Sequence, residues 1–90
     1  MFYYVYVLQS LNCNNKSYTD YTENLKLRFE EQRKGRVAST KNRRPLRLIY
    51  YEAGLNRKDA MHREKYFKTY LGKMFLKKRL KSYLTGCSVL

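Results

Sequence analysis

The sequence predicts one α+β domain in which a small, mainly antiparallel three-stranded sheet is flanked by helices, in the order β-β-α-β-α-α. Two observations support this class. Ninety residues leave room for one modest core, because a chain of this length buries only about 60–65% of its unfolded surface. Aromatic and β-branched residues also form three short runs, separated by segments in which apolar residues recur with helical spacing. We expect the domain to span residues 1–85 and residues 86–90 to form a C-terminal tail.

The first two runs predict an antiparallel hairpin with strands at residues 2–9 and 16–21. The asparagines in residues 11–15 favour a turn between these strands. Because successive side chains of a strand point to opposite faces, Val5 and Val7 share one face of the first strand. The other face of that strand carries Tyr4, Tyr6 and Leu8. The two faces of the second strand carry Tyr18 with Asp20 and Thr19 with Tyr21.

The first helix is expected to run from Glu23 to about Lys34, with Thr22 as its N-cap. Gly35 supplies its C-terminal stop. Small and basic side chains before the only proline predict a basic loop over residues 36–45.

The third strand is expected at residues 46–53, which are almost continuously apolar. Such a run is typical of a strand buried on both faces, so we expect it to be central in the sheet or covered by helices. A second helix is predicted over residues 57–71, because Asn56 begins a loose capping box. Gly72 is expected to separate it from a third helix over residues 73–84.

The charge of the chain indicates what kind of partner it binds. Twenty lysines and arginines against seven acidic residues give a formal net charge of +13. Because 43% of the residues are apolar, the chain should fold, and a folded cation of this size is typical of proteins that bind a polyanion. Ten tyrosines and four phenylalanines are interleaved with the basic residues, as in grooves that bind nucleic acid. A basic surface that serves a ribosomal complex, or only solubility, is the alternative.

Several other classes are left without support. The two cysteines, Cys13 and Cys87, have no Cys-x-x-Cys or Cys/His cluster beside them, so neither a disulfide framework nor a zinc site is indicated. The chain carries no P-loop, dinucleotide-binding, zinc-protease or serine-hydrolase motif. Its longest uncharged apolar run, Phe2 to Leu8, is far shorter than the ~20 residues that span a bilayer. We therefore expect a cytoplasmic protein without membrane contact.

Glu64 is the most informative carboxylate, because Ala60 and Phe67 lie on the same side of the predicted second helix. A carboxylate on an inward face requires a partner. In a protein that binds phosphates, this partner is either Mg²⁺ held together with waters and substrate oxygens, or an arginine such as Arg28 or Arg63. Charge and spacing leave both interpretations open.

Arg28 lies at the edge of the buried side of the first predicted helix, three positions after Leu25. A preorganised arginine there would stabilise the charge that develops on an attacked phosphodiester, but an arginine that extends into solvent fits the same spacing. Tyr6 and Tyr18 lie on neighbouring strands, where packing is the usual role of tyrosine. Beside a metal ion and arginines, a phenol can also take a proton from water or hold that water in place.

Five segments of the chain carry a family resemblance. They are Tyr4-Val5-Tyr6, Tyr18-Thr19-Asp20 with Arg28, Ser39 to Pro45, Leu48-Ile49-Tyr50, and Arg63-Glu64-Lys65-Tyr66. In this order they resemble the motifs of the GIY-YIG endonuclease superfamily. The chain is similar to the small stand-alone bacterial members of the URI type, from Phe2 to about Leu84.

The resemblance implies metal-dependent hydrolysis of a phosphodiester in nucleic acid, with DNA favoured over RNA and a role in repair or recombination. In the family pattern, Tyr6 is the general base or positions the water, and Tyr18 is its neighbour. Arg28 faces the phosphate, and Glu64 binds one Mg²⁺ or Mn²⁺ ion. Residues expected to contact nucleic acid are Lys41, Arg43, Arg44, Arg63 and Lys65. A protein partner is also compatible with the small size of the domain.

Three positions depart from the family pattern. Tyr4 and Asp20 stand where the motifs have glycine, and Gln32 stands where the family often has histidine. The Asp20 carboxylate could repel the phosphate or serve as a second metal ligand. The Gln32 amide can form hydrogen bonds but cannot carry a proton at neutral pH. Asp20 and Gln32 make a nucleic-acid-binding module that has lost cleavage the alternative function.

Overall fold

The computed structural model describes residues 1–11 and 16–85. The strands are β1 (Tyr3–Ser10), β2 (Ser17–Thr22) and β3 (Leu46–Gly54); the helices are α1 (Leu25–Arg33), the 3₁₀-helix η1 (Lys41–Arg43), α2 (Arg57–Phe67), α3 (Tyr70–Arg79) and α4 (Lys81–Thr85). The predicted α+β class and the order β-β-α-β-α-α are confirmed, and the short helix α4 follows them. Most of the predicted turn, the predicted tail and both cysteines lie outside the described ranges.

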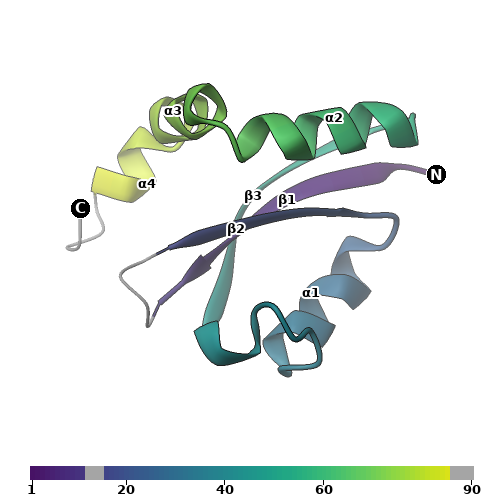
Figure 1. The fold of residues 1–90 in the computed structure, drawn as a ribbon, viewed down its shortest axis with the longest axis vertical. Coiled ribbons are helices and arrows are strands. Elements are labelled where there is room, and N and C mark those ends of the chain that lie inside the picture. The colour runs from purple at the N-terminus through teal and green to yellow at the C-terminus, as the bar shows by residue number, and fades with distance from the viewer. Residues whose placement is uncertain (12–15, 86–90) are drawn as a thin grey trace.

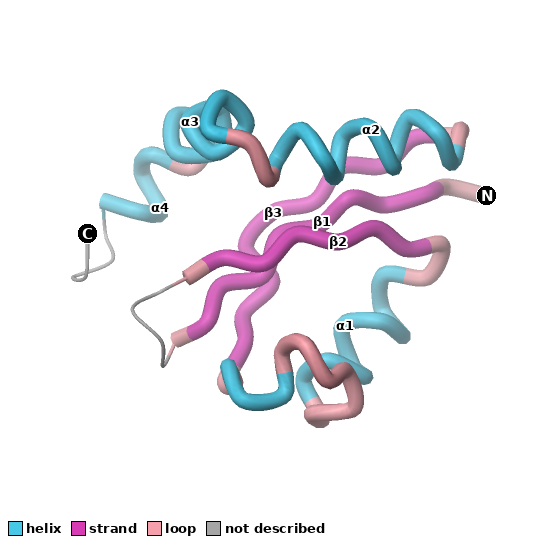
Figure 2. The backbone as a smooth tube through the Cα atoms, viewed as in Figure 1, coloured by secondary structure: helices cyan, strands magenta, loops and turns pink. Residues whose placement is uncertain are grey.

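The sheet lies between two layers of helices. Helices α2 and α3 run across one face, and α1 lies against the other (Figure 1). The strand order is β2-β1-β3, and β1 pairs antiparallel with both neighbours. In the backbone trace of Figure 2, β2 is the edge strand that the connection to α1 leaves. The central position therefore belongs to the first strand of the chain.

The third strand was expected to be buried on both faces and either central or covered by helices; it is not central, and it is only partly buried. β1 is buried along most of its length, including the polar Gln9 and Ser10, whereas β3 forms the edge opposite β2. Tyr51 of β3 is exposed. Tyrosine can leave one side of its ring in water, so a run that is apolar in composition need not be buried on both faces.

Two small cores form on the two faces of β1, as the predicted alternation requires. Val5 and Val7 pack against α2 and α3, through Ala60, Phe67 and Leu76. On the opposite face, the buried side chains of Tyr6 and Leu8 pack with Leu46, Leu48, Leu25 and Phe29. The face that carries Tyr6 is thus the face covered by α1.

The start of α1 differs from the expectation. Asn24, not Thr22, is the N-cap, because the Asn24 side chain accepts a hydrogen bond from the backbone N–H of Leu27 at 3.1 Å. Thr22 remains in β2, and its hydroxyl accepts from the Asn24 N–H at 3.1 Å. At the other end, Gly35 adopts a φ of 79°, which confirms its predicted role as a helix stop.

The helix break predicted at Gly72 is also misplaced. α2 ends at Phe67, and the Thr69 hydroxyl caps α3 by accepting from the Gly72 N–H at 3.1 Å. Gly72 lies inside α3 and is buried, and a Cβ built on it would stand 1.9 Å from the carbonyl oxygen of Tyr66. Glycine is required here for close packing of α3 on the end of α2, and not for its tendency to end helices.

Candidate active site

A pocket of about 310 Å³ lies at the β2 edge of the sheet and receives side chains from both helical layers. β2 contributes Tyr18 and Asp20, and β1 contributes Tyr6. The remaining lining includes Gln32, Ser39 and Thr40 on the side of α1, and Phe67, Lys68 and Lys73 on the side of α2 and α3. The pocket thus extends around an edge strand, so residues from opposite faces of the sheet meet in it.

Tyr6 forms the buried end of this pocket. Its side chain has no exposed surface, and its hydroxyl donates to Oε1 of Gln32 at 3.2 Å. Burial raises the pKa of Tyr6 to about 12, and the negative charge of Asp20 adds to this rise, although Arg28 and Gln32 oppose it. At neutral pH the chain's own groups therefore keep Tyr6 a neutral phenol.

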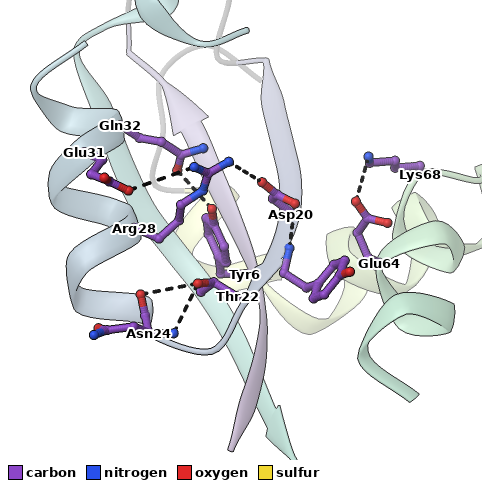
Figure 3. Close-up of polar contacts among 10 residues, drawn as sticks. Tyr6, Asp20, Thr22, Asn24, Arg28, Glu31, Gln32, Glu64 and Lys68 are labelled. Carbon is purple, nitrogen blue, oxygen red and sulfur yellow. Dashed lines mark hydrogen bonds and ion pairs between the residues drawn. The ribbon is translucent and has the colours of Figure 1, made fainter. Parts of the chain in front are cut away.

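Arg28 lies beside the Tyr6 hydroxyl and is held by carboxylates. Its Nη2 is 3.2 Å from Oδ2 of Asp20, and its Nη1 is 4.0 Å from Oε1 of Glu31. Figure 3 shows the Arg28 guanidinium between α1 and Asp20, above the ring of Tyr6. Asp20 is itself fixed, because its Oδ1 accepts from the N–H of Tyr21 at 2.8 Å. The arginine is therefore already paired with a carboxylate beside Tyr6.

Strand register explains why these groups meet. Asp20 lies directly opposite Tyr6, and Tyr18 lies opposite Leu8. Tyr6 and Tyr18 are therefore diagonal neighbours on the same face, a separation of about 7–8 Å in an antiparallel pair. Three of the four predicted catalytic residues, Tyr6, Tyr18 and Arg28, come together on the α1 side of the sheet.

Glu64 occupies the other side of β2. Its side chain is only 14% exposed, and its Oε2 is 3.0 Å from Nζ of Lys68, one turn later on the same helix. Figure 3 shows this pair separated from Arg28 by the strand that carries Asp20. Glu64 does form a salt bridge, as one of the two interpretations predicted, but its partner is Lys68 and not Arg28 or Arg63. Lys68 connects Glu64 to the site, because Lys68 lines the pocket.

The donor set determines which metal ion would fit. Among residues 1–11 and 16–85, no three His, Cys, Asp or Glu side chains are grouped so that they could hold a metal ion. Mg²⁺ is often bound through one or two carboxylates together with waters and substrate phosphates, so a lone, mostly buried carboxylate such as Glu64 fits this mode. A cation, Lys68, already neutralises it. Asp20 points to Arg28 instead.

The predicted nucleic-acid contacts fall into two groups. Lys41, Arg43 and Arg44 are exposed on or beside η1, directly after the pocket residue Thr40, and Lys65 is exposed on α2. Side chains help to hold the backbone of η1: the Ser10 hydroxyl donates to the Arg43 carbonyl at 2.5 Å, and Arg44 Nε donates to the Lys41 carbonyl at 3.0 Å.

Arg63 is engaged inside the fold. Its Nε and Nη2 donate to the two carboxylate oxygens of Glu52 at 2.9 and 3.0 Å. Its guanidinium carbon lies 5.1, 4.6 and 4.8 Å from the ring centroids of Tyr66, Phe67 and Phe75. This bidentate and cation–π arrangement ties β3 to α2 and α3, and Arg63 does not line the pocket at the β2 edge.

The pocket residues that sequence reasoning missed include Lys68, Thr40 and Lys73. Lys68 follows Glu64 by four positions, so the helical ion-pair rule could have identified it. No sequence pattern pointed to Thr40. In the structure it is 3% exposed, and its Oγ1 has no hydrogen-bond partner among the described residues. A buried hydroxyl without a partner beside Tyr6 and Gln32 suits a ligand oxygen or a water. Lys73 enters the pocket only because α3 packs closely on α2.

The sequence matches the model of a known family. The GIY-YIG catalytic domain matches residues 2–80, so the chain belongs to the GIY-YIG family. The resemblance deduced from the motifs is thereby confirmed. Among the described residues, no helix is long and apolar enough to cross a membrane.

Particular relatives are bacterial UPF0213 proteins. The chain is 46% identical over 67 residues to a UPF0213 protein of Pediococcus pentosaceus, covering 73% of this chain and 68% of the relative. It is 37% identical over 76 residues to one of Staphylococcus haemolyticus, covering 83% of this chain and 90% of the relative. The solution NMR structure of a UPF0213 protein from Bacillus halodurans is similar in fold, with a TM-score of 0.54 and 28% identity, covering 87% of this chain and 84% of that one.

Proposed function

We propose that the protein is a metal-dependent endonuclease that hydrolyses phosphodiester bonds in DNA. The pocket at the β2 edge carries this proposal, because it brings Tyr6 and Tyr18 to the same cavity as Lys68, the ion-pair partner of Glu64. The net charge of +13 supports a polyanionic substrate. The family match supports a catalytic role for the domain.

In this mechanism Arg28 binds a non-bridging oxygen of the scissile phosphate by exchanging Asp20 for it. The two side chains are each about one third exposed, so the ion pair that must be broken is weak. A guanidinium preorganised in this way stabilises the charge that develops on the phosphate oxygens. Lys68, which lines the pocket, offers a second cation, whereas Arg28 reaches the phosphate from beside the pocket residue Asp20.

The neutral Tyr6 phenol positions the attacking water. Its hydroxyl proton is donated to Gln32, and Arg28 approaches its oxygen as a donor, so one further acceptor position is left for a water. Thr40 Oγ1, buried and without a partner among the described residues, offers a second contact in the same pocket. With a pKa of about 12, Tyr6 suits this positioning role better than that of a general base in the absence of an added cation.

Glu64 would hold the divalent ion, Mg²⁺ or Mn²⁺, next to the pocket. When bound, such an ion supplies Lewis-acid stabilisation of the phosphate charge and lowers the pKa of a bound water. Lys68 must then release Glu64, and its 57% exposed side chain is free to turn toward substrate. We further propose that the reaction belongs to DNA repair or recombination in the cytoplasm, with a protein partner supplying specificity.

A metal-titrated cleavage assay tests this function. Branched, nicked and single-stranded DNA, with an RNA of matched sequence, are incubated with the wild type, Glu64→Gln and the control Asp59→Asn. Asp59 is an exposed acid on the same helix, so its substitution matches the change in charge. We expect Glu64→Gln to lower metal-dependent cleavage by about 10²-fold or more, and the control to keep it. Equal cleavage by the wild type and Glu64→Gln would remove the proposed function.

Two observations favour a second candidate, a nucleic-acid-binding module that has lost cleavage. Asp20 holds Arg28 in an ion pair, and Gln32 offers Tyr6 an amide that cannot carry a proton at neutral pH. Cleavage gained by Asp20→Gly over an inactive wild type would support this candidate. A wild type that cleaves efficiently would exclude it.

A further inference from the structure

The charge of the chain changes character after Glu64. Every acidic residue lies at or before Glu64, whereas seven lysines and arginines follow it. Five of the seven lie on α3 or at the start of α4: Lys73, Lys77, Lys78, Arg79 and Lys81. No carboxylate side chain is therefore available within this segment to neutralise them. A positive helix of this kind attracts polyanions over the distance of a Debye length, about 8–10 Å in ordinary salt.

Three of these lysines form a continuous line that starts inside the pocket. Lys68 and Lys73 both line it, and Lys77 lies one turn beyond Lys73 on the same side of α3. All three side chains are exposed. Lys73 and Lys77 have no ion-pair partner among the described residues, and Lys68 pairs only with Glu64. We call Lys68, Lys73 and Lys77 the lysine track.

Packing around Gly72 holds the lysine track in place. Because Gly72 has no side chain, α3 begins in direct contact with the backbone at Tyr66, and Lys73 is thereby brought to the pocket that Lys68 lines. Successive turns of the helix are about 5.4 Å apart. One strand of nucleic acid presents a phosphate about every 3.4 Å of duplex axis, so long lysine side chains one turn apart can reach phosphates one or two steps apart.

An exposed aromatic ring accompanies the lysine track. Tyr70 is 75% exposed and lies three positions before Lys73, on the same side of α3. Single strands are bound where a basic groove follows the backbone and aromatic rings stack on bases. Lys73 and Lys77, which have no ion-pair partner among the described residues, and the exposed Tyr70 form a surface continuous with the pocket. This combination distinguishes it from a basic surface that serves only solubility.

We propose that the lysine track binds the phosphates of the nucleic-acid strand that leaves the pocket, with Tyr70 stacking on one of its bases. The proposal rests on the proposed function, because it names the path of the substrate beyond the site of cleavage. It assigns to α3 a role that was expected only of residues at η1 and on α2. The strand then crosses the molecule from the pocket at β2 toward α4, along the helix seen in Figure 1.

Salt dependence of binding tests the lysine track without requiring cleavage. Labelled single-stranded DNA is titrated with the wild type and the double variant Lys73→Gln/Lys77→Gln, in chelator and over a series of salt concentrations. Lys26→Gln/Lys58→Gln is the matched control, since it removes the same charge from exposed positions on α1 and the start of α2. Each phosphate contact contributes about 0.7 to the slope of log K against log salt for single strands, so two lost contacts lower its magnitude by about 1.4. The control should keep the wild-type slope.

The outcomes separate this proposal from the proposed function. A lower slope for the Lys73/Lys77 variant than for the control supports the lysine track, even if the wild type never cleaves DNA. Equal slopes for the two variants overturn the lysine track, even if the wild type is an active nuclease. Vesicles rich in phosphatidylserine provide the competing polyanion. Loss of binding to vesicles with unchanged binding to DNA would also overturn the proposal and assign α3 to a membrane surface.

Discussion

Replacing Asp20 by Asn should strengthen the binding of nucleic acid while slightly weakening the fold. The Asp20–Arg28 contact joins side chains that are 34% and 35% exposed, with a closest approach of 3.2 Å. Ion pairs with this exposure are worth about 0.2–1 kcal/mol. A phosphate that binds Arg28 must break this pair in the wild type but not in the variant. The same energy corresponds to about 1.4–5-fold tighter binding.

The measurement for Asp20→Asn is anisotropy of labelled DNA in chelator, at one salt concentration. Glu23→Gln is the matched control, because Glu23 is exposed, has no ion pair among the described residues and changes the net charge equally. NMR of the Tyr6 ring supplies a second readout: without the Asp20 charge, the pKa of Tyr6 should fall below its value of about 12. Binding by Asp20→Asn no tighter than by Glu23→Gln would refute the view that Asp20 competes with phosphate for Arg28.

Three further predictions concern stability. Gly72→Ala should unfold at markedly lower temperature than Gly54→Ala, because a Cβ at Gly72 meets the backbone at 1.9 Å whereas one at Gly54 meets nothing within 4 Å; equal melting temperatures would contradict this packing. The pKa of Tyr6 is raised from 10.0 to about 12, and this shift contributes roughly 2–3 kcal/mol to the free energy of unfolding. The contribution is complete below pH 10 and is lost as the pH rises to 12. Tyr6→Phe should therefore show a smaller alkaline loss of unfolding free energy than the wild type. Arg63→Met should cost about 1.5–3 kcal/mol in chemical denaturation, because it leaves the Glu52 carboxylate with only one of its partners; an unchanged midpoint would contradict this.

Local pattern predicted much of this fold. The alternation of Val5 and Val7 against Tyr6 was enough to place the two cores on the correct faces. Sheet order was not accessible in the same way. All three strands are rich in aromatic residues, and composition does not reveal which of them has a partner on both sides. The third strand was therefore expected to be either central or covered by helices, and the central position in fact belongs to β1.

In the candidate site, too, local pattern predicted some positions and left others unpredicted. The positions of Tyr6, Tyr18 and Arg28 follow from motif and register, so their meeting on one face could be expected. The partner of Glu64 depends on where α2 ends and which side chains reach back along it, and Lys68 was missed for that reason. Gly72 was interpreted through its backbone freedom, yet its importance lies in the side chain that it lacks. Tertiary packing decides both cases.

Because the candidate site extends around β2, its composition depends on strand register. Side chains alternate faces with a period of two, so a single-residue insertion within β2 would exchange Tyr18 and Asp20 for their neighbours. The carboxylate that now faces Arg28 would turn toward Glu64, and the arginine would lose its partner. A deletion of one residue would have the same effect. β2 should therefore tolerate changes of length only in steps of two residues, a constraint on sequence variation that no single side chain of the site imposes.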